Sequence, residues 1–258
     1  FVPPICGGTN QHKPEGFNLS DHGLKSIRTH IWHDWIFINF NGKAKKFEEY
    51  AKPLIKRFND IDLTKLNYVA TLDFGKINTN WKFLIENFIE PYHVQFVHKT
   101  TTNQPLKDHY TFVDGKCYGS GVDVEQEDEK NYNALSVTSR YLSLFPNFIM
   151  GTYYPNQVGV YLNIPISPGI TSQKRIIYTI DNKVMTKKEI QATKDIWWSV
   201  HKEDHEMCER LQEGRSSPAS NNGGLLSPVW EKGVQAFQKL IINSIRRSFK
   251  MTRRVKNV

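Results

Sequence analysis

Two histidines in residues 80–98 (NWKFLIENFIEPYHVQFVH) have the residue types and spacing of metal ligands. His93 and His98 are five residues apart, and Glu90 stands three residues before the first of them. Neutral imidazoles ligate transition metals, and oxygen ligands beside them bias the choice of ion. Histidine pairs in helical segments are also common as ordinary structural residues. The segment therefore indicates a metal site without establishing one.

A helix that ends early must position these side chains. Six apolar residues recur every three or four positions, which predicts an amphipathic helix facing the core: Trp81, Leu84, Ile85, Phe88, Ile89 and Tyr92. Residues five apart lie about 140° apart around a regular helix. A shared ion therefore requires the helix to bend or end between the histidines. Pro91 favours such a break, because it cannot donate an N–H to the carbonyl of Asn87.

A third ligand is expected from residues 201–209 (HKEDHEMCE). Spacing alone does not choose among four acids, namely Glu203, Asp204, Glu206 and Glu209. His201 and His205 are four residues apart, which is zinc-like spacing. The zinc protease motif requires Glu directly after the first histidine, however, and Lys202 stands there. A separate zinc site is therefore the less favoured interpretation.

The other elements predict an α+β chain. A hairpin is expected over residues 24–41 with a turn at His33-Asp34, and strands over 68–77 and through 139–182. Helices are expected over 185–212, capped by Thr186 and Glu189, and over 228–250. Residues 99–138 are expected to be irregular and include an exposed acidic segment at 125–130.

Length and composition allow one large domain, or one domain and a fragment, in 258 residues. The net charge is +8, and the basic residues that end the chain favour a solvated helix end over a nucleic-acid site.

Cys6, Cys117 and Cys208 include no C-x-x-C pair, which favours a reducing compartment. No apolar run is long enough to span a membrane, and the first residues lack signal-peptide features. We therefore expect a cytoplasmic protein that binds neither nucleic acid nor membranes.

The sequence resembles the catalytic domain of the Rieske non-haem iron oxygenases, the ring-hydroxylating oxygenase α subunits. The resemblance lies in residues 80–98, in EDHEMCERLQEG (203–214) and in the hairpin IRTHIWHDWIFINFNG. Its specific positions occur in the family's order: Asn80-Trp81-Lys82, Glu86-Asn87, Tyr92-His93, His98, Glu203-Asp204 and Gln212. The resemblance implies a helix-grip fold (Bet v 1-like or START-like), an antiparallel sheet wrapped around a long helix. Residues 44–258 would form this catalytic domain, and residues 1–43 would be the last strands of a truncated all-β Rieske domain.

The resemblance also implies roles for individual residues. His93, His98 and Asp204 would bind a mononuclear Fe(II), leaving positions open for O₂ chemistry. Glu90 would link the iron site to the Rieske [2Fe–2S] cluster of a neighbouring subunit, and Asn87 would lie near the iron. A homotrimer or a multiple of one is implied, with electrons supplied by a reductase or ferredoxin.

Two departures from the family pattern affect the expected activity. The C-x-H and C-x-x-H ligands of a Rieske cluster are absent from this sequence. The best-known aromatic dioxygenases have Asp at the position of Glu90. In having Glu there, this sequence resembles the branch of the family that oxidises quaternary ammonium compounds. The interval from His98 to Asp204 is also short for the naphthalene-type enzymes, which favours an enzyme without a β subunit.

The leading hypothesis is a terminal oxygenase that hydroxylates a small aromatic compound with O₂. The alternative within the family is an N-demethylating or hydroxylating monooxygenase of a quaternary ammonium compound. Six aromatic residues could line either pocket, as a hydrophobic wall or a cation–π cage, or could be core: Tyr141, Phe145, Phe148, Tyr153, Tyr154 and Tyr161. Two alternatives of other classes remain, a non-catalytic helix-grip ligand carrier and a zinc hydrolase that uses the same ligands.

Overall fold

The computed structural model describes residues 15–18, 21, 23–102, 104–122, 139–153, 156–180 and 184–255. Cys6, the acidic segment 125–130 and Tyr154 lie outside the described residues. The chain divides into two compact units, Phe1–Glu49 and Tyr50–Val258.

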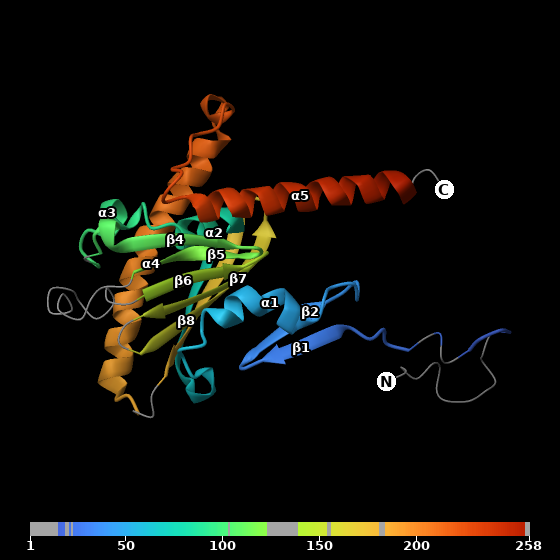
Figure 1. Cartoon of the computed structure of the whole chain (residues 1–258), viewed down its shortest axis with the longest axis horizontal. Helices are drawn as coiled ribbons and strands as arrows, with labels where there is room; N and C mark the ends of the chain where they lie inside the picture. Colours follow the sequence, from blue (N-terminus) through green and yellow to red (C-terminus); the bar gives the residue numbers. More distant parts are fainter. Residues whose placement is uncertain are drawn as a thin grey trace. The chain divides into compact units, whose positions relative to one another are not determined.

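The first unit contains an antiparallel hairpin of β1 (Arg28–Trp32) and β2 (Trp35–Asn39). Its turn is His33-Asp34, as predicted, and His33 has a positive φ of 51°. Residues 24–27, which were expected to be part of the hairpin, precede the first strand. These two strands form a sheet of their own (Figure 1).

The second unit is built on one antiparallel sheet of seven strands in the order β3-β9-β8-β7-β6-β5-β4 (Figure 1). The strands are β3 (Asn67–Ile77), β4 (His109–Asp114), β5 (Cys117–Val122), β6 (Ser139–Leu144), β7 (Phe148–Tyr153), β8 (Gln157–Ser167) and β9 (Ile170–Thr179). β3 pairs with β9, so segments about a hundred residues apart in sequence lie side by side.

Strands β4 and β5 contradict the expectation that residues 99–138 are irregular. The sequence of β5, CYGSGV, has two glycines, which weaken a strand signal because they offer no side chain to pack. The structure gives a reason for Gly119, since a Cβ atom there would lie 1.9 Å from the backbone oxygen of Tyr141. The close approach of β5 and β6 therefore requires glycine at position 119. The same glycine weakens the sequence signal for a strand, which is why β5 was not predicted.

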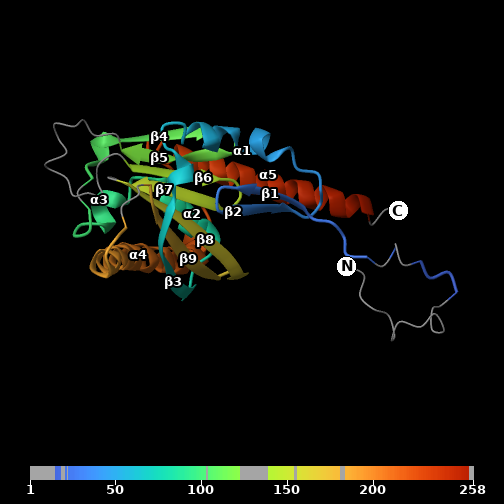
Figure 2. The same ribbon diagram turned by 90° about the horizontal axis from the view of Figure 1, so that it is seen from below.

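The described residues also form five α-helices: α1 (Phe47–Lys56), α2 (Trp81–Ile89), α3 (Val94–Val97), α4 (Lys187–Ser216) and α5 (Lys232–Val255). Helix α2 contacts both α4 and α5, and all three pack on the sheet (Figures 1 and 2). Helix α1 continues through Pro53, and α5 begins four residues later than expected. The seven-stranded sheet gripping the 30-residue α4 confirms the predicted α+β helix-grip fold.

The core lies between this sheet and the three helices. One cluster joins α2, α5 and three strands: Ile85, Ile89, Tyr118, Ile149, Tyr161, Val234 and Phe237. A second cluster joins α4 to the sheet: Leu72, Tyr153, Ile177 and Trp197. The two clusters fix α2 and α4 on the same face of the sheet, and these helices carry or precede every predicted site residue.

The start of α4 has the predicted capping box. The Thr186 side chain accepts a hydrogen bond from the backbone N–H of Glu189, and the Glu189 carboxylate accepts one from the backbone of Thr186. Replacing Thr186 with alanine is expected to lower the free energy of unfolding by about 1 kcal/mol, because a helix N–H loses its acceptor. Urea denaturation measures this loss. Thr186→Ser keeps the hydroxyl and should unfold like the parent chain, whereas equal destabilisation by both variants would contradict a role for the cap.

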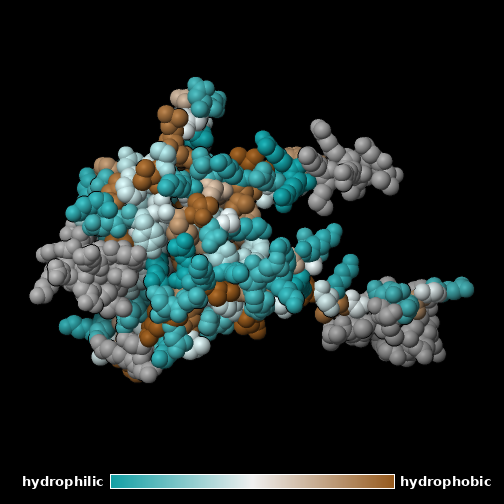
Figure 3. Space-filling view, viewed as in Figure 1, coloured by the Kyte–Doolittle hydropathy of each residue, from teal (hydrophilic) through white to brown (hydrophobic). Residues whose placement is uncertain are grey.

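Hydrophilic residues cover much of the surface seen in Figure 3, with smaller hydrophobic areas among them. Within the described part of the chain, no helix combines the length and the apolar character needed to cross a membrane.

Candidate metal centre

A break in the chain after α2 positions the two histidines. The side chain of Asn80 caps α2 by accepting a hydrogen bond from the N–H of Lys82, and the helix ends at Ile89. Glu90 is extended, as the residue before a proline prefers to be. His93 and His98 then flank the single turn of α3, with their ring centroids 5.2 Å apart. The predicted break therefore exists, but it lies before His93 and not between the histidines.

Hydrogen bonds between the start of α2 and the end of α4 fix the position of α4 along the site. The hydroxyl of Thr79 donates to the carbonyl of Cys208 at 3.0 Å, and the N–H of Asn80 donates to the Gln212 side chain at 2.9 Å. Cys208 and Cys117 are both buried and free. This alignment brings Asp204, one helical turn before Cys208, opposite the histidines.

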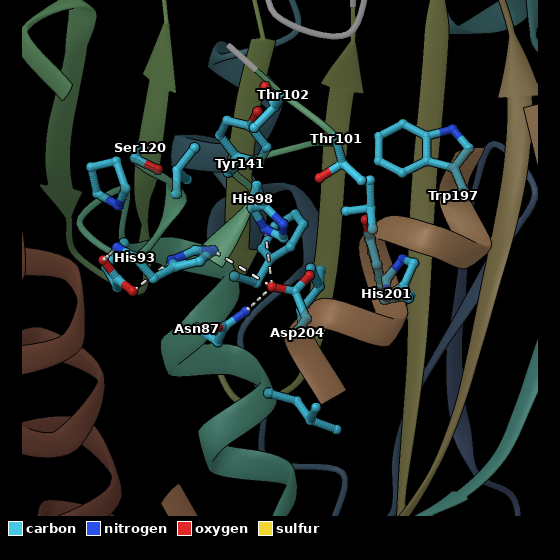
Figure 4. A pocket seen from close by; sticks show the side chains of 18 of the residues that line it. Asn87, His93, His98, Thr101, Thr102, Ser120, Tyr141, Trp197, His201 and Asp204 are labelled. Carbon is cyan, nitrogen blue, oxygen red and sulfur yellow. Dashed lines mark hydrogen bonds and ion pairs between the residues drawn. The ribbon is translucent and has the colours of Figure 1, made fainter. Parts of the chain in front are cut away.

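The structure brings His93, His98 and Asp204 together, with one possible ligand atom of each within 4.8 Å of the others (Figure 4). Asp204 Oδ1 lies 3.1 Å from His98 Nε2 and 3.6 Å from His93 Nε2. Asn87 Nδ2 donates to the same oxygen at 2.9 Å, so it orients the carboxylate. Metal–ligand bonds of about 2.1 Å place neighbouring ligand atoms at similar separations. Two imidazoles and one carboxylate therefore fit a divalent ion and leave coordination positions open.

Each histidine uses its other nitrogen to bind a second carboxylate. His93 Nδ1 lies 2.7 Å from Glu90 Oε1, and His98 Nδ1 lies 2.8 Å from Glu203 Oε2. The hydroxyl of Thr101 donates to Glu203 at 2.6 Å. Such outer partners fix the tautomer and orientation of a metal-binding histidine. Both Nε2 atoms are thereby directed toward Asp204.

The four acids that spacing could not separate have different positions. Asp204 faces both histidines, and Glu203 faces His98 from the outer side. Glu206 is exposed, and Glu209 accepts a hydrogen bond from the N–H of Asn78. The contact of Glu203 with His98 was not predicted. Adjacent residues on a helix point in different directions, and the sequence does not show which of these side chains faces the histidines.

The charges of the site support one another. Burial acts to lower the pKa of His98, but the charge and hydrogen bond of Asp204, with a hydrogen bond to Glu203, raise it to about 9. Burial likewise acts to lower the pKa of His93, but the charge and hydrogen bond of Glu90, together with the charge of Asp204, raise it. Burial acts to raise the pKa of Asp204, but the charge and hydrogen bond of His98 hold it well below its usual range. Asp204 is therefore ionised at neutral pH, as a metal ligand must be.

Replacing Glu203 with alanine is expected to weaken Fe(II) binding by about 10- to 100-fold, because His98 loses the carboxylate that orients its ring. Competition with a chromogenic chelator under anaerobic conditions measures this affinity. Glu206→Ala removes an exposed acid from the same helix and serves as the control. Equal affinities for the two variants would show that Glu203 does not support His98.

A cavity of about 80 Å³ opens beside the three clustered side chains. Glu90, His93, His98 and Asp204 line one part of it. Aromatic residues and a histidine line another part: Phe88, Tyr141, Tyr153, Tyr161, Trp197 and His201. Of the aromatic residues considered in the sequence, Phe145 instead packs against Phe237, and Phe148 is not among the lining residues.

The nitrogen atoms of His201 and His205 have partners of other kinds. His205 Nε2 lies 2.7 Å from Gln173 Oε1, and His201 Nε2 lies 3.4 Å from a guanidinium nitrogen of Arg175. Burial, followed by the charge of Arg175, lowers the pKa of His201 well below its usual range. A cation next to His201 opposes metal binding, so the zinc-like spacing of this pair does not lead to a zinc site here.

Comparisons with known proteins agree with this geometry. Residues 56–246 match the family model described as ring hydroxylating alpha subunit (catalytic domain). The chain is 24% identical over 230 residues to chloroplastic choline monooxygenase of Atriplex hortensis, covering 86% of this chain and 51% of that protein.

Solved structures share the fold. The quaternary ammonium Rieske monooxygenase CntA matches with a TM-score of 0.73 at 18% identity, covering 88% of this chain and 64% of the other. Its crystal structures include complexes with the substrates L-carnitine and γ-butyrobetaine. Naphthalene 1,2-dioxygenase matches with a TM-score of 0.58 at 18% identity, covering 83% and 58%.

The chain spans about half the length of the choline monooxygenase that it matches. The family model, in contrast, covers most of the chain, including both histidines and Asp204. The chain therefore belongs to the ring-hydroxylating α subunits of the Rieske non-haem iron oxygenases and contains their catalytic domain.

Proposed function

We propose that this chain is the catalytic part of a terminal oxygenase that uses O₂ to oxidise a small organic substrate at a mononuclear Fe(II). The observation that carries the proposal is the convergence of His93, His98 and Asp204 within 4.8 Å. A ligand carrier has no need of two imidazoles and an ionised acid at one point beside its cavity.

His93, His98 and Asp204 would hold the Fe(II), which when bound supplies the activation of O₂. Glu90 and Glu203 hold the two imidazoles with Nε2 toward the shared point, and Asn87 orients Asp204. Aromatic side chains form much of the rest of the cavity lining and would limit the water that it holds.

The substrate class that we favour is a quaternary ammonium compound. Five curated relatives that match over 83–90% of the chain are named as choline monooxygenases, and CntA is described as a quaternary ammonium monooxygenase. Glu at position 90 agrees with that branch of the family. Hydroxylation of a small aromatic compound, the leading hypothesis from sequence, is the second candidate, and it draws on the fold shared with naphthalene 1,2-dioxygenase.

The electron supply is also part of the proposal. A Rieske [2Fe–2S] cluster, fed by a reductase or ferredoxin, would deliver electrons through Glu90 across a subunit interface in a homotrimer or a multiple of one. We infer that the β1–β2 hairpin belongs to the Rieske domain. Its separate two-stranded sheet supports this inference, because such a sheet is marginally stable without further strands.

Anaerobic equilibrium dialysis against Fe(II) and Zn(II) tests the proposal. The chain should bind one Fe(II), and His98→Ala should lose it, whereas His30→Ala in the hairpin should not. A chain that retains small ligands but binds no iron would favour the carrier. A preparation that hydrolyses substrate with Zn(II), without O₂ or electrons, would favour the hydrolase.

A further inference from the structure

Arg175 carries a buried charge that forms no direct ion pair with a carboxylate of the described residues. It lies on β9 in the interior of the sheet, opposite Tyr161 of β8 and Leu72 of β3, and its exposed fraction is 0%. No ion pair joins it to a carboxylate among the described residues. Arginine is almost never fully buried unless it is paired, because removing its charge from water is costly.

Aromatic rings surround the guanidinium. Its central carbon lies 3.3 Å from the ring centroid of Trp197, 4.7 Å from that of Tyr153 and 5.0 Å from that of Tyr161. These rings also line the cavity. Three rings that could have formed a cation–π cage for a substrate ammonium group are therefore already occupied by Arg175. An ammonium group bound against them would lie close to a like charge.

Hydrogen-bond donors exceed acceptors around Arg175. Nη1 donates to the hydroxyl oxygen of Tyr161, which lies 2.9 Å from the hydroxyl oxygen of Tyr153. One of the two tyrosine hydrogens forms that bond, and the other remains for a further acceptor. Arg175 Nε and Nη2 have no hydrogen-bond partner among the described residues. His201 Nε2 lies 3.4 Å from Nη1, and burial and the charge of Arg175 hold this imidazole neutral, so it does not balance the charge of the guanidinium.

The cavity thus has two ends of opposite character. Figure 4 shows His93 and Trp197 on opposite sides of Asp204. Glu90 lies beside His93, whereas Tyr153 packs against Trp197 and lies within hydrogen-bond distance of Tyr161 around Arg175. An acidic group on a ligand would accept the free tyrosine hydrogen and neutralise the buried guanidinium behind it.

We propose that Arg175 is a specificity-determining residue that selects substrates carrying a carboxylate, bound at the Tyr153–Tyr161–Trp197 end of the cavity. This inference rests on the proposed function, because the group to be oxidised then lies at the His93–His98–Asp204 end. A quaternary ammonium substrate would be a zwitterion, with its ammonium group toward Glu90 and Asp204. Arg175 acts through the charge behind these rings and through the Tyr161 hydroxyl.

Two matched ligand pairs test the proposal by isothermal titration of the full chain, with and without anaerobic Fe(II). Glycine betaine and choline share a trimethylammonium group and differ in carboxylate against alcohol. Salicylate and phenol make the same comparison for an aromatic ring. The carboxylate member of at least one pair should bind about tenfold tighter or more, since hydrogen bonds to charged groups are among the stronger ones. Which pair shows the preference identifies the ligand class.

Two variants link the preference to Arg175. Arg175→Gln should remove the difference within the pair, and thermal melting checks that this buried variant folds. Tyr153→Phe removes one of the two hydroxyl groups and leaves Arg175 in place, and it should reduce the preference several-fold. Three results would overturn the proposal. These are equal binding of both members of each pair, no binding of any carboxylate, and a preference that is unchanged in both Tyr153→Phe and a folded Arg175→Gln. Failure of the proposed function can be told apart from failure of this inference. The first would appear as absent Fe(II) binding, whereas the titration without metal would still measure the carboxylate preference that depends on Arg175.

Discussion

Replacing Asp204 with alanine is expected to weaken Fe(II) binding by more than about 100-fold, a larger effect than loss of an outer partner such as Glu203. Oδ1 of Asp204 faces both Nε2 atoms, and this carboxylate is the only negative ligand in the cluster. Without it, two neutral imidazoles remain, and three-point binding becomes two-point binding. Competition with a chromogenic chelator, under anaerobic conditions, measures the affinity of each variant.

The matched control for this experiment is Asp195→Ala. Asp195 is an exposed acid on the same helix, nine residues earlier. Its carboxylate accepts a hydrogen bond from the Gln191 side chain, and its backbone carbonyl accepts one from the hydroxyl of Ser199. This variant should bind iron like the parent chain. Parental affinity in Asp204→Ala, with an unchanged circular dichroism spectrum, would remove Asp204 from the ligand set and leave the oxygenase proposal without its third ligand.

Replacing Phe237 with alanine is expected to lower the free energy of unfolding by about 3–5 kcal/mol, the cost of a cavity left by a large aromatic side chain. Phe237 of α5 is completely buried in the cluster that holds Ile85 and Ile89 of α2. Its ring lies 5.9 Å from that of Trp81 and 5.8 Å from that of Tyr118. Urea denaturation of the chain measures the change.

Phe249 provides the comparison on the same helix. It is 68% exposed, so Phe249→Ala should change the free energy of unfolding by no more than about 0.5 kcal/mol. Because α2 leads into both histidines, Phe237→Ala should also weaken iron binding, although its side chain is not part of the site. Similar stabilities for the two variants would show that α5 does not anchor α2.

Much of the fold was readable because it follows local patterns. The capping box at Thr186 and Glu189, the hairpin turn at His33-Asp34 and the strands from residue 139 onward are encoded by neighbouring residues. The errors occurred where tertiary contact overrode local preference. Gly119 weakens the sequence signal for β5, although the packing of β5 against β6 leaves no room for a side chain at that position. Tyr92 was predicted to face the core, but it is 45% exposed because α2 ends before it.

The sequence by itself determined the family, the helix-grip fold and the segment that carries the histidines, because those depend on residue types at fixed short spacings. Only the tertiary structure decided which of four neighbouring acids faces His93 and His98, since that depends on how α4 is aligned against α2 by Thr79, Asn80 and Gln212. It also decided that Arg175 fills an aromatic cage. Strands and a helix distant in sequence form that cage, and the balance of charge and hydrogen bonds in a cavity exists only once they are packed together.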